Sequence, residues 1–432
     1  MSKLRPPRWA PLVLERPLVR RAWLAGVSLI LVSTIFAVVL YLRQLVAEER
    51  IQSRYAEHGS FQKRVASAIE SAGGFLSLSN ELKLEGFEQP LIVQYSFDSS
   101  LQRAMEALYR EYRPDYGAFV AMDAVTGRVL ALLSYEAPGR RRSWPKSDDG
   151  PDHLALRATF PSASVFKVVT AAAVIAEKDF SGDTVITFNG RNHTLYRSNV
   201  LKNEHNRWTR SMTLRDAFAR SVNTVFGKIG AFSLSAGNLR DYAGRLGFNR
   251  KIAGEIPIQE SVAKFGEDRW EMAEAASGFT KDNRMSPMQG ALMAAAIVND
   301  GVMMEPWVVG SVHRQDGTQV YDALPKVASE ALDVGTARAI RGLMRETIRR
   351  GTSRGSFRGF GRGLARAVEV GGKTGSLKGD DPPGKYDWFV GYADNGPDRI
   401  AIAALTVHKE YWRVKSSYLA RRAIEYYFKA RR

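Results

Sequence analysis

The longest uninterrupted hydrophobic stretch of the chain lies near its N-terminus. Residues 22–42 read AWLAGVSLILVSTIFAVVLYL, which is 21 residues without a charged side chain. A helix of about 20 apolar residues is long enough to cross a bilayer, so we predict a transmembrane helix over this range. The run is long for a cleaved signal peptide and no clear small-residue cleavage site precedes Arg43, which favours an anchor that stays attached.

The charges on the two sides of this helix differ. Residues 1–21 carry six basic side chains, with Glu15 as the only acid. Cytoplasmic flanks of membrane helices are enriched in lysine and arginine, so we predict that residues 1–21 are a cytoplasmic tail and that the chain after Leu42 lies outside the cytoplasm. Residues 43–90 are charged and weakly amphipathic, which predicts a juxtamembrane stalk.

From residue 91 the pattern becomes that of a folded domain, which we place at 91–432. Apolar and alternating runs predict strands at 91–97, on either side of a turn within 116–136, and at 366–376, 387–393 and 399–408. Helical spacing predicts a helix after Asp98, a largely helical region at 164–299 with patterns at 214–229 and 287–298, and a closing helix at 416–430. Strands at both ends with helices between them predict an α+β fold, in which distant segments complete one sheet and a helical lobe is inserted.

Composition narrows the classes of partner and of chemistry. The formal net charge of +17 indicates anionic surroundings, such as nucleic acid, phospholipid headgroups or acidic polymers, and the predicted compartment argues against nucleic acid. The absence of cysteine excludes a disulfide framework, a thiolate zinc site and a cysteine nucleophile. The six histidines show no metal-ligand spacing, so we expect no metal and no other cofactor.

An arginine-rich stretch stands out in the C-terminal third. Residues 349–366 read RRGTSRGSFRGFGRGLAR and contain no acid. In a cytoplasmic protein this composition would favour RNA binding. In the predicted compartment we interpret it as a basic surface loop, either facing anionic wall or membrane material or simply solvated.

One lysine interrupts an otherwise apolar helix pattern. In FPSASVFKVVTAAAVIAEK, residues 160–178, Lys167 follows Ser164 by three positions, so on a helix the two side chains share a face. The lysine can act as a base toward the hydroxyl once its ammonium has lost its proton, and burial would lower its pKa. A single such lysine is more often one whose amine reaches the surface while its stem covers the core.

Ser-x-x-Lys alone is a weak motif, because it also occurs at Ser60 and Ser261. The order of other short motifs separates the three. A Ser-x-Asn sequence at 221–223 and a Lys-Thr-Gly sequence at 373–375 each follow Ser164, and SVN and KTG each occur once in the chain. Ser60 lies in the predicted stalk and Ser261 follows the Ser-x-Asn sequence, so the ordered set begins at Ser164.

These three motifs in this order are the signature of penicillin-binding proteins and serine β-lactamases. The chain from about Leu91 to Val407 resembles the transpeptidase domain of a penicillin-binding protein. The resemblance extends to GAFVAMDAVTGRVLAL, to SPMQGALMAAAIVNDGVMMEP, and to GKTGS with DWFVGY. It implies an antiparallel sheet flanked by helices with an all-α lobe, as in β-lactamases. Ala163 and Ser376 depart modestly from the glycine and threonine that many members carry.

The resemblance assigns catalytic roles to the first two motifs. Ser164 is the nucleophile and Lys167 is its base. Ser221 relays a proton toward the leaving amine, and Asn223 positions the substrate amide and the lysine. A second cation, Lys373, would lower the pKa of Lys167 further.

The resemblance assigns substrate binding to the third motif. Lys373, Thr374 and the hydroxyl of Ser376 hold the terminal carboxylate of the substrate. The backbone N–H groups of Ser164 and Ser376 form an oxyanion hole. Glycines such as Gly375 weaken a strand but let an extended peptide approach its edge.

The implied function is that of a peptidoglycan D,D-transpeptidase, which cross-links stem peptides ending in D-Ala-D-Ala through a serine acyl-enzyme and which binds β-lactams. The implied location is the bacterial cytoplasmic membrane, with a separate glycosyltransferase polymerising the glycan. A D,D-carboxypeptidase would use the same residues. A β-lactamase is disfavoured because no Glu-x-x-x-Asn lies between Asn223 and Lys373. A non-catalytic β-lactam receptor or scaffold is a further alternative, although about 21 residues before the membrane leave little room for a signalling domain.

Overall fold

The computed structural model describes residues 17–71, 81–83, 88–139, 151, 153–202, 204–380 and 382–431. The chain divides into two compact units, residues 1–61 and 62–432. Helix α1 (Pro17–Ser71) contains a candidate membrane span, Trp23–Arg50, with an 18-residue window of mean hydropathy 2.4. By length and composition this stretch can cross a membrane, as the sequence predicts for residues 22–42. The helix continues through the predicted stalk as far as Ser71, and the second unit begins at residue 62, ahead of the domain start expected at 91.

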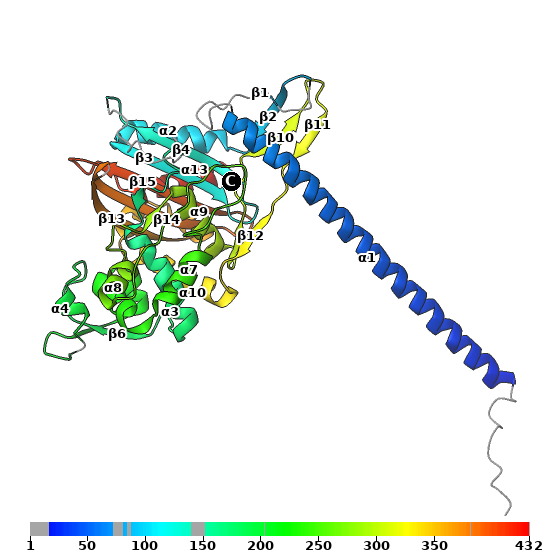
Figure 1. Cartoon of the computed structure of the whole chain (residues 1–432), viewed down its shortest axis with the longest axis horizontal. Helices are drawn as coiled ribbons and strands as arrows, with labels where there is room; N and C mark the ends of the chain where they lie inside the picture. The colour runs from blue at the N-terminus through cyan, green and yellow to red at the C-terminus, as the bar shows by residue number, and fades with distance from the viewer. Residues whose placement is uncertain are drawn as a thin grey trace, which may run out of the picture. The chain divides into compact units, whose positions relative to one another are not determined.

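A five-stranded antiparallel sheet forms the centre of the second unit (Figure 1). The strands run in the order β13 (Glu369–Asp380), β14 (Pro383–Asp394), β15 (Arg399–His408), β3 (Tyr116–Asp123) and β4 (Val129–Glu136). The early strand β3 pairs along its length with the late strand β15. Distant segments therefore complete one sheet, as predicted.

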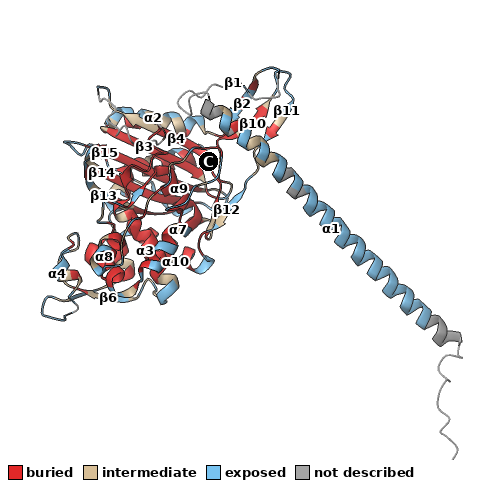
Figure 2. Ribbon diagram, in the orientation of Figure 1, coloured by how far each residue is buried: buried red, intermediate tan, exposed pale blue. Residues whose placement is uncertain are grey.

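Helices cover both faces of this sheet. Helix α2 (Ser99–Tyr112), which Asp98 caps, and helix α13 (Ser416–Lys429) pack on one face in a core that includes Phe119 and Phe389. Helix α9 (Pro287–Val298) packs on the other face, where a Cβ added at Gly290 would lie 2.9 Å from Val390 Cγ2. Every residue of α9 is buried, which explains why its pattern is apolar on all sides. Figure 2 shows the sheet and α9 mostly in the colour of buried residues, whereas α2 also carries intermediate and exposed residues.

Helices are the main regular structure of the region 164–299, as predicted, but four short strands lie within it or at its borders. The helices are α3 (Lys167–Lys178), α4 (Arg197–Val200), α5 (Leu214–Ala219), α6 (Asn223–Lys228), α7 (Ala236–Arg245) and α8 (Arg269–Ser277), with a 3-10 turn at Ala163–Phe166 and a π turn at Ile229–Ser233. The strands are β5 (Phe160–Pro161) paired with β8 (Arg284–Met285), and β6 (Val185–Phe188) paired with β7 (Arg210–Thr213). The helical pattern at 214–229 is two helices, α5 and α6, separated at the Ser-x-Asn sequence.

Several elements had no counterpart in the sequence analysis. They are helix α10 (Val334–Arg349), the two-stranded sheet of β9 (Val302–Met304) with β12 (Val327–Glu330), and a small sheet in the order β1 (Glu81–Leu82), β2 (Leu91–Tyr95), β10 (Val309–His313) and β11 (Gln319–Asp322). Only β2 of that sheet was expected. The other strands are two to five residues long, and the sheet is completed by the pairing of β10 with β2, which is distant in sequence.

The arginine-rich stretch is not a simple surface loop, which corrects the sequence-based interpretation. It forms the short helices α11 (Arg354–Phe357) and α12 (Arg362–Ala367). Phe357 and Leu364 are buried in the core under α13, and the ring centroid of Phe357 lies 6.0 Å from that of Phe389. The strand predicted at 366–376 accordingly starts later, at Glu369, and extends to Asp380. The apolar residues between the arginines decide the structure because they face the core.

Candidate active site

The predicted nucleophile lies on a tight turn that leads directly into helix α3. Strand β5 is followed by the 3-10 turn Ala163–Phe166, and α3 begins at Lys167. Lys167 Nζ lies 2.7 Å from Ser164 Oγ. The lysine is fully buried, so its amine does not reach the surface. The structure therefore brings the two residues into the contact that their spacing predicts.

The amine of Lys167 has two further oxygen partners. Asn223 Oδ1 lies 2.8 Å away and the carbonyl oxygen of Ser277, at the end of α8, lies 2.5 Å away. Burial lowers the pKa of Lys167 well below its usual value, and the nearby charge of Lys373 lowers it further. A neutral amine has two protons to donate to Asn223 and Ser277, which leaves its lone pair free to accept the hydroxyl proton of Ser164.

The Ser-x-Asn sequence occupies the break between two helices. Helix α5 ends at Ala219, Ser221 has a positive φ of 57°, and α6 begins at Asn223. Asn223 Nδ2 donates to the carbonyl oxygen of His193 at 3.0 Å, which turns Oδ1 toward Lys167. This break between α5 and α6 therefore presents both side chains to one site.

Lys373 is the second buried lysine of the site. It lies on strand β13, and its Nζ donates to Ser221 Oγ at 2.8 Å and to the carbonyl oxygen of Thr374 at 2.9 Å. Burial lowers the pKa of Lys373 to about 7. Within the described residues, neither Lys373 nor Lys167 forms a salt bridge. Lys373 Nζ lies 5.6 Å from the centroid of the Phe218 ring, and Lys167 Nζ lies 5.6 Å from that of the Phe226 ring. Two amines without a carboxylate partner are thus held close together.

Strand β13 lies very close to the turn that carries Ser164. A Cβ added at Gly375 would lie 3.1 Å from Val165 Cγ2 and 3.2 Å from the carbonyl oxygen of Ser162. The sequence analysis attributed this glycine to the approach of a substrate backbone. The structure gives it a packing role, because it lets the strand and the nucleophile turn approach each other.

The sequence analysis did not identify Thr352 as a site residue. Its Oγ1 lies 2.5 Å from Thr374 Oγ1, and its backbone N–H donates to the carbonyl oxygen of Ala219 at 3.0 Å. A Cβ added at the preceding residue, Gly351, would lie 2.1 Å from that same carbonyl oxygen. The Gly-Thr pair inside the arginine-rich stretch was the available signal, because a glycine is needed where the chain passes this close to helix α5.

A cleft of about 530 Å³ joins these parts. Of the predicted site residues, Ser164, Ser221, Asn223, Thr374, Gly375 and Ser376 line it, and the two lysines lie buried beneath. Besides Thr352, nine residues of its wall were not expected from the sequence: His193, Gly278, Phe279, Leu377, Lys385, Asp387, Trp412, Lys415 and Ser417. The oxyanion hole expected from the backbone N–H groups of Ser164 and Ser376 stays a prediction.

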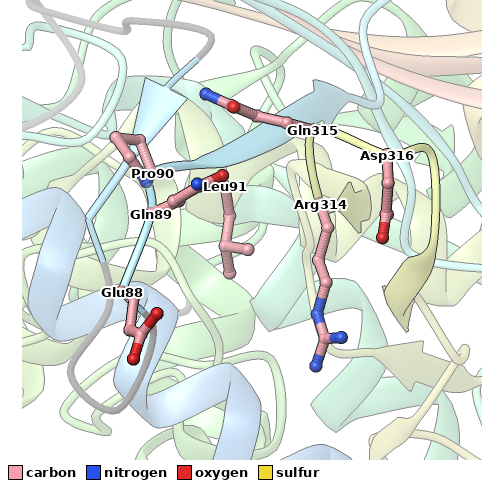
Figure 3. A pocket seen from close by; sticks show the side chains of 7 residues that line it. All are labelled: Glu88, Gln89, Pro90, Leu91, Arg314, Gln315 and Asp316. Atoms are coloured by element: carbon pink, nitrogen blue, oxygen red, sulfur yellow. The ribbon is translucent and has the colours of Figure 1, made fainter.

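A second cavity lies on the small sheet and contains none of the motif residues. It has a volume of about 430 Å³ and lies between the start of β2 and the turn joining β10 to β11 (Figure 3). Its lining residues are Glu88, Gln89, Pro90, Leu91, Arg314, Gln315 and Asp316. No serine or lysine lines it, so the chemistry of the ordered motifs belongs to the first cleft.

Comparison with known proteins points to one family. The family model described as the penicillin binding protein transpeptidase domain matches residues 117–424. The chain is 26% identical over 319 residues to a peptidoglycan D,D-transpeptidase PbpA of Mycolicibacterium smegmatis, and 26% identical over 323 residues to PbpA of Mycobacterium tuberculosis. Each alignment covers 68% of this chain and 62% of the relative, so the chain spans less than two thirds of the length of these curated relatives.

Solved structures show the same fold. The D,D-transpeptidase domain of a peptidoglycan glycosyltransferase from Eggerthella lenta aligns with a TM-score of 0.64 and 24% identity, covering 84% of this chain and 87% of that structure. Penicillin-binding protein A from Mycobacterium tuberculosis, as its ceftriaxone acyl-enzyme complex, aligns with a TM-score of 0.62 and 24% identity, covering 78% and 80%. The predicted α+β fold is therefore confirmed.

The turn that carries Ser164 makes a close backbone contact with Gly278. Gly278 has a φ of 67°, and a Cβ added there would lie 1.9 Å from the carbonyl oxygen of Ala163, itself at a φ of 48°. We expect Gly278→Ala to lower the free energy of unfolding by about 3 kcal/mol, since it combines an unfavourable backbone conformation with overpacking.

Gly317→Ala is the matched control for this prediction, because Gly317 also has a positive φ, 84°, but a Cβ there would meet nothing within 4 Å. We expect it to cost about 1 kcal/mol from the backbone conformation alone. Urea unfolding of the two variants measures the difference. Equal losses would contradict the claim that contact with the Ala163 carbonyl restricts this position.

Proposed function

This chain belongs to the family of penicillin-binding protein transpeptidase domains, and we propose that it is a serine D,D-transpeptidase that cross-links peptidoglycan. The observation that carries the proposal is the 2.7 Å contact between Ser164 Oγ and the amine of the buried Lys167, at the floor of a cleft. The names of the relatives, which are peptidoglycan D,D-transpeptidases, support the reaction class.

In the first step Ser164 attacks the substrate. Lys167 Nζ takes the hydroxyl proton while Oγ forms a bond to the carbonyl carbon of the penultimate D-Ala. The backbone N–H groups of Ser164 and Ser376 stabilise the oxyanion of the tetrahedral intermediate. The bond to the terminal D-Ala nitrogen then breaks, and Ser221, which accepts a hydrogen bond from Lys373, relays to that nitrogen the proton that Lys167 took up, so that Lys167 is neutral again. Terminal D-Ala leaves and the acyl-enzyme remains.

The terminal carboxylate of the substrate is held at the edge of β13. The Lys373 ammonium supplies the charge, and the hydroxyl groups of Thr374 and Ser376 supply hydrogen bonds. The 2.5 Å contact between the hydroxyl oxygens of Thr352 and Thr374 fixes the direction in which the Thr374 hydroxyl points. A β-lactam carries a carboxylate and an acyl carbonyl in a similar arrangement, so it enters the same position and acylates Ser164.

In the second step an amine attacks the acyl-enzyme. The amine of a neighbouring stem peptide attacks the acyl carbonyl, its proton passes to neutral Lys167, and Ser164 leaves with its hydroxyl restored. A carboxypeptidase would use water at this point. The transpeptidase assignment is favoured by the named activity of the relatives. The separate glycosyltransferase expected from the sequence stays a prediction.

Labelling with a penicillin tests the proposed function. We expect the full-length chain in detergent to bind a fluorescent penicillin covalently and to keep the label for hours, because the acyl-enzyme has no built-in deacylating carboxylate of the Glu-x-x-x-Asn type. Ser164→Ala should abolish the label. Ser60→Ala is the control, since Ser60 begins another Ser-x-x-Lys match but lies exposed on α1.

Two other outcomes of the penicillin labelling would point to a different function. Label lost within seconds would indicate a β-lactamase. Absence of label in a chain that melts cooperatively would contradict the proposed function. Transfer of a D-Ala-D-Ala donor to an added amine, compared with its hydrolysis, distinguishes a transpeptidase from a carboxypeptidase.

The pH dependence of acylation follows from the two buried lysines. Lys167 must be neutral to accept a proton, so the rate rises as the pH passes its lowered pKa. Lys373 must be charged to hold the carboxylate, so the rate falls as the pH rises above about 7. We expect a bell-shaped profile of kcat/KM for acylation by a penicillin, with its falling limb near neutrality.

Two variants check the assignment of the limbs. Lys167→Met should lower the acylation rate by about 10³, which lies within the range for loss of a general base. Lys373→Arg keeps a permanent charge and should remove the falling limb in a chain that still folds. A wild-type rate that keeps rising to pH 10 would show that neither lysine has the lowered pKa.

We also propose the orientation that the sequence predicts, with residues 1–21 in the cytoplasm and the folded domain outside. The chain contains no cysteine, so a single introduced thiol reports its own side of the membrane. In intact bacterial spheroplasts, a membrane-impermeant maleimide should label Ser60→Cys and should label Ser2→Cys only after lysis. The opposite pattern would contradict the orientation.

A further inference from the structure

Two lysine side chains in the wall of the active-site cleft lie against the ring of one tryptophan. Lys385 lies on β14, and Trp412 and Lys415 lie on the segment 409–415 between β15 and α13. Lys385 Nζ lies 3.5 Å from the centroid of the Trp412 ring, and Lys415 Nζ lies 5.2 Å from it. All three line the same cleft as Ser164. The ordered motifs of the family do not include any of them.

The positive charge of this cluster is not balanced by the protein around it. In the part of the chain that the structure describes, no salt bridge involves Lys385 or Lys415. The nearby carboxylate, Asp387, is buried, and its Oδ2 accepts a hydrogen bond from the backbone N–H of Ser416 at 2.7 Å. Burial raises the pKa of Asp387 to about 7, so it carries only part of a negative charge at neutral pH.

The neighbouring lysines and the neighbouring acid act on the pKa of Lys385 in opposite directions. Burial lowers the pKa of Lys385; Asp387 opposes this effect, whereas Lys415 and Lys378 add to it. Lys378 is directly opposite Lys385 in the register of β13 with β14. Three cations therefore face one partly charged acid, which leaves this end of the cleft positive. Such a site attracts an anion.

The register of the sheet shows which part of a substrate would reach this cluster. Ser376 is opposite Asp387, and Lys378, two residues further along β13, is opposite Lys385. Two residues of strand span roughly 7 Å. In the proposed reaction the terminal carboxylate lies at Lys373 and Thr374, so the donor peptide preceding the scissile bond extends along β13 from Ser376 toward Lys378. The residues of the donor upstream of D-Ala-D-Ala therefore pass the cluster.

We propose that Lys385 and Lys415, supported by Trp412, form a subsite for a second carboxylate of the donor peptide, carried by a residue upstream of its D-Ala-D-Ala end. The subsite rests on the proposed function for its substrate class, because the donor position is set by Ser164 and Lys373. The Trp412 ring keeps the two ammonium groups apart from bulk water on one side and holds them on the cleft wall. An arriving carboxylate relieves their mutual repulsion.

Equilibrium binding tests the subsite without requiring any reaction. The probe is a short D-Ala-D-Ala peptide with a free carboxylate on an upstream residue, compared with the same peptide bearing a primary amide there. Both are titrated into the full-length Ser164→Ala chain in detergent at low salt. We expect the free carboxylate to bind about tenfold more tightly, as two charge-assisted contacts in a partly exposed cleft allow.

Substitutions then assign the preference to the two lysines. Lys385→Met with Lys415→Met removes both charges but keeps unbranched side chains of similar length, and it should reduce the preference to about one. Lys385→Arg with Lys415→Arg should retain it. Lys409→Met is the matched control, because Lys409 is an exposed lysine of the same segment that does not line the cleft.

Penicillin labelling of the same variants in a Ser164 background separates failure of the subsite from failure of the proposed function. Normal labelling with equal affinities for the two peptides would overturn the subsite and leave the function standing. A carboxylate preference that survives in the double Met variant would also overturn it. A preference abolished by the double variant in a chain that is not labelled by penicillin would support the subsite and contradict the proposed reaction.

Discussion

The structure depends on one lysine amine that is both buried away from water and hydrogen-bonded. Lys167 is fully buried, and a buried ammonium without a partner is so costly that such a group usually gives up its proton. Its three oxygen partners come from the nucleophile turn, from the start of α6 and from the end of α8. Each of these elements must therefore be in place for the amine to be satisfied. The same requirement positions Ser164, so the fold and the proposed chemistry share one constraint.

Close backbone contacts meet this requirement. Gly278, which ends α8, lies against the carbonyl of Ala163, and Gly375 brings β13 within contact of Val165. Ala163 itself has a left-handed backbone conformation, which explains why glycine suits this position in many members of the family. The turn before α3 is thus held between a helix end and a sheet edge. A Cβ at Gly278 would clash with the Ala163 carbonyl, and one at Gly375 would press tightly against the same turn.

The sequence predicted those parts of the fold that depend on residues close together in the chain. The strands on either side of a turn within 116–136 and the helix that follows Asp98 were predicted from neighbouring residues, and the structure has them. The sequence could not predict contacts between residues that are far apart in the chain. Thr352 reaches Thr374 only because helix α10 returns the chain to the sheet edge, and Phe357 is buried only because α13 covers it. The arginines around Phe357 misled the interpretation, since composition averages over residues whose environments are set by tertiary packing.

The two buried lysines act as one electrostatic unit. Lys373 lowers the pKa of Lys167, so a charge on the first favours a neutral second. A substrate carboxylate placed beside Lys373 stabilises its ammonium form and raises its pKa. It therefore keeps the charge on Lys373 while Lys167, which lies deeper beneath Ser164 and has no anion to stabilise it, stays neutral. In the proposed reaction the carboxylate that positions the substrate thus also sets the protonation state that its attack requires. A substrate without that carboxylate would lose its orientation and the added effect of the Lys373 charge on the base, whose pKa burial already lowers.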